Sequence, residues 1–235
     1  MASGLLTQIA AFADAVDGAD WDAPVPTCPE WPLRVLVGHL GQAPRWAAGI
    51  VRGGTPDGIP DPREAVPPRD WRTWLLAGAS GLVEAVRAIG PGTQVWTLTG
   101  PGPASSWLRQ RTHDTSVHAV DAALLAGVPY AIEPDLAADA VTQCLELLSS
   151  QVAALRGTGS IGLRPAEQSI EGWVITRTPT GVSWRRGLGP GPTDVTVTGA
   201  VEDLLLVLMR RLPPQRVAID GDRQLFDHWL AHSAL

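Results

Sequence analysis

The chain of 235 residues is 45% hydrophobic and 18% charged, which is the balance of a folded, water-soluble protein. Its net charge of −6 excludes the strongly basic surface that recruits nucleic acid or an anionic membrane. All 18 basic residues are arginine, so chemistry that needs a lysine Schiff base or a P-loop lysine is excluded as well.

The cysteines and the apolar segments indicate the compartment. Cys28 and Cys144 lie far apart in the sequence and in no CxxC pair, which favours a reducing environment over a disulfide framework. The N-terminal stretch has no basic leader and carries Asp14 and Asp17 among its apolar residues, unlike a signal peptide. The longest strongly apolar run, 204–209, is too short to span a bilayer. We therefore expect a cytoplasmic protein.

Helical periodicity dominates the first two thirds of the chain. Helices are predicted at about 5–16, 31–51, 70–89, 107–125 and 136–155. Apolar residues recur at helical spacing in the first three, and the segment 107–125 contains neither Gly nor Pro. The Gly- and Pro-rich stretches between them, including 17–32 and 91–104, read as loops. Because short connections favour antiparallel neighbours, residues up to about 155 are predicted to form a helical bundle.

The pattern changes after residue 156. The remaining segments predict a hairpin at 173–184, a strand at 194–198, a helix at 201–212, a strand at 217–220 and a helix at 223–230. This switch from helical to mixed periodicity predicts a two-domain α+β protein. Its parts would be a helical bundle over 1–156, which would hold a metal site, and a small α+β domain over 157–235.

The helix expected at 107–125 carries the strongest chemical candidates. Asp114 and His118 lie one turn apart and share a face. His39, on the helix at 31–51, lies at the edge of that helix's apolar face. Two imidazoles and a carboxylate from facing helices are a donor set that a catalytic zinc uses. The alternative is a hydrogen-bonded Asp–His pair that supports the helix without metal.

Arginines near these residues have two possible roles. Arg111 lies one turn before Asp114, where it can bind a substrate carboxylate or orient Asp114 or Asp121 through a salt bridge. Arg210 and Arg211 lie in the last turn of the helix expected at 201–212, where they can be surface charges that interact favourably with the C-terminal end of the helix dipole.

Two further features concern the surroundings of this cluster. Trp31, Trp46 and Trp107 are candidates for the wall of a pocket over a metal ion. His113 points away from His118 on the same helix and is expected at the surface or beside the site.

Several motifs together resemble one known family. The segments PTCPEWPLRVLVGHLG, RTHDTSVHAVDAALLAG, VTVTGAVEDLLLVLMRRLP and DGD are similar to the mycothiol-dependent maleylpyruvate isomerase family of actinobacteria. That family resembles the DinB-like metal-binding four-helix bundles, with a small C-terminal α+β domain added. The resemblance implies a divalent metal, usually zinc, held by His39, Asp114 and His118. Asp114 stands where the family usually has Glu, whose side chain is one methylene longer.

The resemblance also implies a reaction. A metal-bound thiol, supplied by mycothiol, becomes a thiolate at neutral pH. The thiolate adds to a conjugated cis double bond, rotation follows about the new single bond, and expulsion of the thiolate leaves the trans product. A related transferase would instead release the thiol adduct. Arg211, or Arg111, would hold the substrate carboxylate or enolate.

Two other functions stay open on the same scaffold. One is a metal-dependent hydrolase or natural-product tailoring enzyme in which bound water replaces the thiol. The other is a non-catalytic metal-binding protein. The expected partners are a low-molecular-weight thiol and an electrophilic small molecule, with neither nucleic acid nor membrane.

Overall fold

The computed structural model describes residues 2–54, 58–151 and 155–233. The chain divides into two compact units, Met1–Tyr130 and Ala131–Leu235. Within the described residues, no helix combines the length and the apolar character that crossing a membrane requires.

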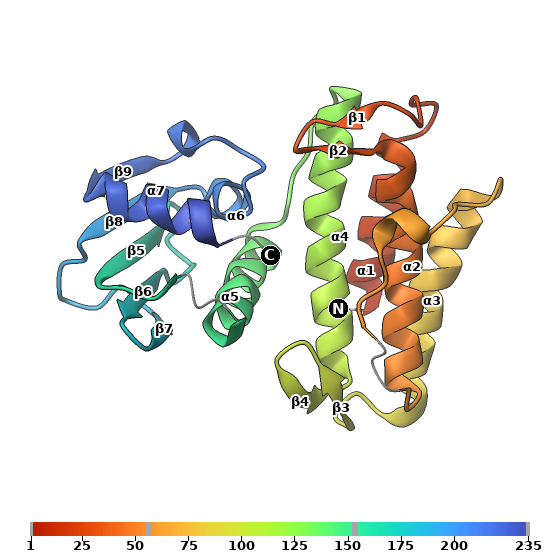
Figure 1. Cartoon of the computed structure of the whole chain (residues 1–235), viewed down its shortest axis with the longest axis horizontal. Coiled ribbons are helices and arrows are strands. Elements are labelled where there is room, and N and C mark those ends of the chain that lie inside the picture. The colour runs from red at the N-terminus through yellow and green to blue at the C-terminus, as the bar shows by residue number, and fades with distance from the viewer. Residues whose placement is uncertain (1, 55–57, 152–154, 234–235) are drawn as a thin grey trace. The chain divides into compact units, whose positions relative to one another are not determined.

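The first unit is a bundle of helices α1 (Ala2–Ala15), α2 (Leu33–Val51), α3 (Trp71–Ile89) and α4 (Ser105–Ala126). Helix α1 packs on α3 and α4, and α2 packs on α3 and α4 (Figure 1). Leucine, isoleucine and valine side chains of all four helices fill one hydrophobic core. The expected four-helix bundle is therefore confirmed. A 3-10 turn, η1 (Pro62–Glu64), lies against α2.

Helix α2 is held close to α3 by a glycine. A Cβ atom at Gly41 would overlap the ring of Trp74, so only glycine permits this approach. Arg45 lies over the Trp74 ring at 4.6 Å and donates a hydrogen bond to the Trp74 carbonyl over 2.7 Å. Helix α4 ends at Gly127, whose φ of 66° is the left-handed conformation that glycine adopts readily. These contacts fix the helices that carry the candidate site.

Two segments that were expected to be loops contain short antiparallel hairpins. Strands β1 (Pro24–Val25) and β2 (Cys28–Pro32) form the first, and β3 (Gln94–Thr97) and β4 (Gly100–Pro103) form the second. The hairpins lie at opposite ends of the bundle (Figure 1). Because β2 includes Trp31 and Pro32, helix α2 begins at Leu33 rather than at residue 31.

The second unit is a mixed sheet with helices packed on it. Its strand order is β7-β6-β5-β8-β9, in which β5 and β8 are parallel and the other neighbours are antiparallel. The strands are β5 (Gly159–Pro165), β6 (Trp173–Thr178), β7 (Gly181–Arg186), β8 (Val195–Gly199) and β9 (Ala218–Gly221). The other elements are α5 (Pro134–Gln151), α6 (Val201–Leu208), η3 (Pro214–Arg216) and α7 (Arg223–His232). The predicted α+β architecture is confirmed, and β5 is a strand that the sequence pattern did not reveal.

The division between the units differs from the expected boundary at residue 156. Helix α5 lies in the second unit, where it packs on α6 and β7. The indole N–H of Trp173 in β6 donates to the hydroxyl of Thr142 in α5 over 3.1 Å, and both residues are buried. Helical periodicity alone could not separate α5 from the bundle, because a helix on a sheet and a helix in a bundle both bury one face.

Candidate metal centre

The bundle brings His39, Asp114 and His118 together. His39 comes from α2, and the other two come from successive turns of α4. The Nε2 atom of His39 lies 3.3 Å from Asp114 Oδ2, and His118 Nε2 lies 3.9 Å from Asp114 Oδ1. One donor atom of each side chain lies within 4.8 Å of the other two. The helices therefore place two imidazoles and one carboxylate around a common point.

This donor set fits a divalent cation. Zinc binds imidazole nitrogen and carboxylate oxygen at about 2.0–2.2 Å, so two tetrahedral ligand atoms lie roughly 3.4 Å apart. The separation of 3.3 Å between His39 Nε2 and Asp114 Oδ2 matches that value. The other separations are wider, at 3.9 Å between His118 Nε2 and Asp114 Oδ1 and no more than 4.8 Å between any two of the donor atoms. The shorter Asp114 side chain thus still reaches both histidines.

The charges around the cluster favour the protonation states that bind metal. Burial alone would raise the pKa of Asp114, but the Arg111 guanidinium, 3.3 Å from its Oδ2, and the nearby imidazoles together hold that pKa below its ordinary value. Burial lowers the pKa of His39, and Asp114 offsets only part of that shift. An ionised carboxylate and a neutral imidazole are the forms that coordinate a cation.

A chain of hydrogen bonds supports His118 from the side opposite Asp114. Its Nδ1 lies 2.8 Å from Oδ2 of Asp121, which is fully buried. The other oxygen of Asp121 accepts a hydrogen bond from the Thr27 hydroxyl over 2.6 Å. A carboxylate that holds the second nitrogen of a histidine ligand is a recurrent feature of metal sites. Asp121 follows His118 by three residues, so helical spacing could have predicted the contact between them. Nothing in the sequence pointed to the contact between Thr27 and Asp121.

Trp31 forms one wall of the cluster. Its ring lies 5.6 Å from the His39 ring and 6.3 Å from the His118 ring, and it is nearly parallel to the latter at 24°. The expectation that Trp46 and Trp107 share this role is wrong, because their rings pack 5.2 Å apart in a separate cluster with Trp96. His113 is buried on α4 rather than lying at the surface.

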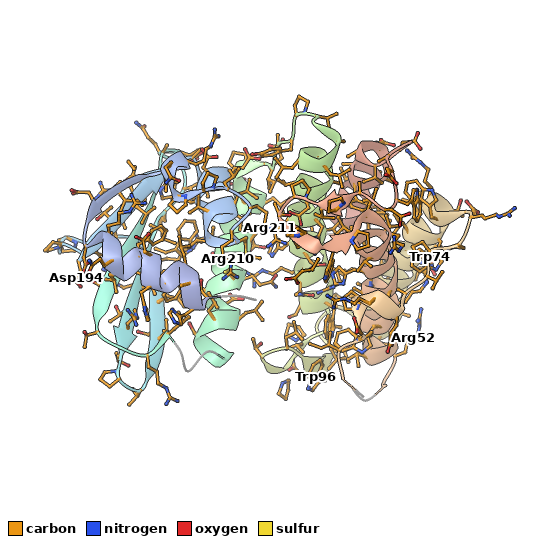
Figure 2. The ribbon with its side chains drawn as sticks, turned by 45° about the horizontal axis from the view of Figure 1, so that its top comes forward. Arg52, Trp74, Trp96, Asp194, Arg210 and Arg211 are labelled. Atoms are coloured by element: carbon orange, nitrogen blue, oxygen red, sulfur yellow. The ribbon has the colours of Figure 1, made fainter. Side chains whose placement is uncertain are left out.

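The remaining site candidates are arginines. The Arg111 side chain is 8% exposed and donates to Asp114 and to Gln110, so it belongs to the cluster. Arg211 follows α6 in the second unit, and its Nη1 donates to the Met209 carbonyl over 2.8 Å (Figure 2). Its neighbour Arg210 adopts the left-handed conformation, with a φ of 59°, which ends α6 before the expected residue 212. A functional role for Arg211 stays a prediction.

Comparison with known proteins identifies the family. Residues 3–123 match the family model described as the mycothiol maleylpyruvate isomerase N-terminal domain. The chain belongs to the mycothiol maleylpyruvate isomerase family. Residues 135–228 match the C-terminal domain of the same family, and the division of the structure after Tyr130 falls in the gap between the two matched ranges. This membership confirms the resemblance inferred from the motifs and supports the prediction of an isomerase-type enzyme.

Solved structures show the same fold. The crystal structure of the mycothiol-dependent maleylpyruvate isomerase matches with a TM-score of 0.60 and 16% identity, over 93% of this chain and 91% of that one. A single-substitution mutant of that isomerase matches with a TM-score of 0.63 at the same identity and coverage. No curated protein matches the chain significantly in sequence. The architecture of the isomerase family is thus kept at low sequence identity.

Proposed function

We propose that the chain is a zinc- and mycothiol-dependent isomerase or S-transferase that acts on a small electrophilic molecule in the cytoplasm. The observation that carries this proposal is the convergence of His39, Asp114 and His118 within 4.8 Å in a chain of the isomerase family. When bound there, a zinc ion would lower the pKa of a coordinated thiol and so supply a thiolate at neutral pH. Family membership supports mycothiol as the source of that thiol.

The buried charges of the cluster favour a thiolate as the additional ligand of a bound cation. The carboxylates of Asp114 and Asp121 together carry one more negative charge than the Arg111 guanidinium balances. A divalent cation would turn this excess into a single positive charge, which a thiolate would neutralise. Because uncompensated charge is costly in a partly buried site, this balance favours the thiolate over the neutral thiol.

The two arginine candidates receive different roles in this proposal. The guanidinium of Arg111 is buried and bonded to Asp114, so we assign it the role of holding that carboxylate in place as a ligand. Arg211, which the family resemblance singled out, is then the candidate for binding the carboxylate or enolate of the substrate. A bidentate guanidinium suits that group well.

The chain's own thiols do not suit the role of nucleophile. Cys144 is buried on α5, and burial raises its pKa to about 12, with a partial offset from Arg210. Cys28 is not among the side chains whose donor atoms converge. A protein with a site for a thiolate but no suitable thiolate of its own needs an external thiol, which supports the mycothiol-dependent reading.

The test combines metal analysis with an assay. Purified protein should hold about one zinc per chain and convert maleylpyruvate or another electrophile only when mycothiol is added. His39→Ala should lose the metal and the activity together, whereas His232→Ala, an exposed histidine on α7, should lose neither. Thiol-independent turnover would favour a metal-dependent hydrolase. Absence of stoichiometric metal, with no effect of His39→Ala, would leave a non-catalytic protein.

A further inference from the structure

The β1–β2 hairpin contacts the metal centre through a residue to which the proposed function gives no role. Thr27 lies in the connection between the two strands, and its hydroxyl donates to Asp121 Oδ1 over 2.6 Å. The two residues are 94 positions apart in sequence, so this bond exists only because the hairpin folds onto α4. A short hydrogen bond to a fully buried carboxylate is among the stronger contacts a hydroxyl can make.

The hydrogen bonds of Asp121 determine which nitrogen of His118 carries a proton. An ionised carboxylate only accepts hydrogen bonds. With Asp121 ionised, Thr27 donates to one oxygen over 2.6 Å and the imidazole donates from Nδ1 to the other over 2.8 Å. That tautomer leaves the lone pair on Nε2, the nitrogen on the side of Asp114. Thr27 holds one oxygen of the carboxylate that imposes this choice.

The same hairpin also contacts the face of the His118 ring. Trp31 in β2 lies nearly parallel to the imidazole, with ring centroids 6.3 Å apart. The hairpin thus restrains His118 in two ways. Thr27 acts on the edge of the imidazole through Asp121, and Trp31 packs on its face. Restraint from two directions fixes both the position and the rotation of a ring.

We propose that Thr27 is a positioning residue of the metal centre. Through Asp121 it holds the His118 imidazole in the Nδ1–H tautomer and in the orientation in which Nε2 binds the cation. This inference rests on the metal site proposed above. Its consequence is that the hairpin, which contributes no metal ligand, sets the affinity of the site.

The main test measures zinc affinity by competition with a chromophoric chelator. Thr27→Val keeps the shape of the side chain but removes the donor, and it should weaken zinc binding about tenfold or more. Thr27→Ser keeps the hydroxyl and should restore most of the affinity. The matched control is Thr97→Val, because Thr97 in the other hairpin also donates over 2.6 Å, to the Gly100 carbonyl. It should leave zinc affinity unchanged.

A double-mutant cycle tests whether Thr27 affects zinc affinity through Asp121. In an Asp121→Ala background, Thr27→Val should cause no further loss, because the route through the carboxylate is already broken. Equal zinc affinity of Thr27→Val and wild type, or the same loss with and without Asp121, would overturn the inference.

Nitrogen-15 spectra of the metal-free protein separate this inference from the proposed function. His118 should show the Nδ1–H tautomer in the wild type and a mixture in Thr27→Val. A wild type that binds no zinc would refute the proposed function, and the tautomer would still decide the role of Thr27. An unchanged tautomer in Thr27→Val would refute the positioning role even if zinc binds.

Discussion

The two hairpins of the first unit are built alike, but they contact different side chains of α2 and α4. Each is a short antiparallel pair that places a tryptophan against side chains of α2 and α4. Trp31 of the first contacts the imidazoles of both candidate histidine ligands. Trp96 of the second contacts the indoles of Trp46 and Trp107 instead. The two hairpins lie at opposite ends of the bundle (Figure 1). The tryptophan of one hairpin packs on a polar cluster, and the tryptophan of the other, Trp96 (Figure 2), packs on an aromatic cluster.

The difference arises from residues two turns apart on the same helices. His39 and Trp46 are seven positions apart on α2, and Trp107 and Asp114 are seven positions apart on α4. A spacing of seven returns a side chain almost to the same face, roughly 10 Å along the helix. The helices run antiparallel, so the early part of each meets the late part of the other. The two clusters therefore lie along the same seam, the interface between α2 and α4. The identity of the side chains at each end of this seam decides which end can bind metal.

The largest effect is expected from a substitution in the cluster of His39, Asp114 and His118. Asp114→Ala removes one of three donors and takes the carboxylate partner from the buried Arg111. Zinc affinity should fall more than about 100-fold, because ligand loss exceeds the 10- to 100-fold cost of losing a supporting residue. The measurement is competition against a chelator, with the exposed Asp61→Ala as the control. Near-wild-type zinc binding by Asp114→Ala would remove Asp114 from the ligand set.

A smaller effect should be confined to the apolar end. The indole N–H of Trp107 donates to the Trp96 carbonyl over 2.9 Å, and Trp107 is 1% exposed. Trp107→Phe removes this donor and leaves some unfilled volume, so the free energy of unfolding should fall by about 1–3 kcal/mol. Urea unfolding in the presence of a chelator measures this loss.

Zinc affinity is the control for that substitution. Sites about 10 Å apart with no shared partner usually behave independently, so Trp107→Phe should bind zinc like the wild type. A tenfold loss of affinity would show that the two ends of the seam are coupled, and the contrast between the hairpins would no longer hold.

The fold could be predicted from the sequence where periodicity was strong. Helices α1 to α3 have repeated apolar residues at helical spacing, α4 is a long segment without Gly or Pro, and the alternation of helix and strand patterns after residue 170 was equally plain. The hairpins were missed because their strands show no alternation: β1 has two residues and β4 reads GPGP. Strands β1, β2 and β3 contact α2, and β1 also contacts α4; no local pattern encodes such contacts.

The candidate site could be predicted only in part for a related reason. Asp114 and His118 share one helical face, so spacing alone brought them together. Spacing could not pair them with His39, which lies on another helix; the family resemblance implied that pairing, and the structure brings the three side chains together. Thr27 was beyond prediction, because a residue 94 positions from its partner carries no signal in a single sequence.

The smallest effect concerns a thiol outside both hairpins. Burial raises the pKa of Cys144 on α5 to about 12 from an ordinary value of 9.0, although Arg210 offsets part of that shift. Below pH 9 the thiol is protonated in both states, so stability is unaffected. Above pH 9 the unfolded chain releases the proton and the folded chain retains it, so stability falls by up to about 1.4 kcal/mol per pH unit. Cys144→Ala should lack this slope between pH 9 and 10.5 in urea titrations. Identical slopes would place the thiol in contact with solvent and would contradict its burial on α5.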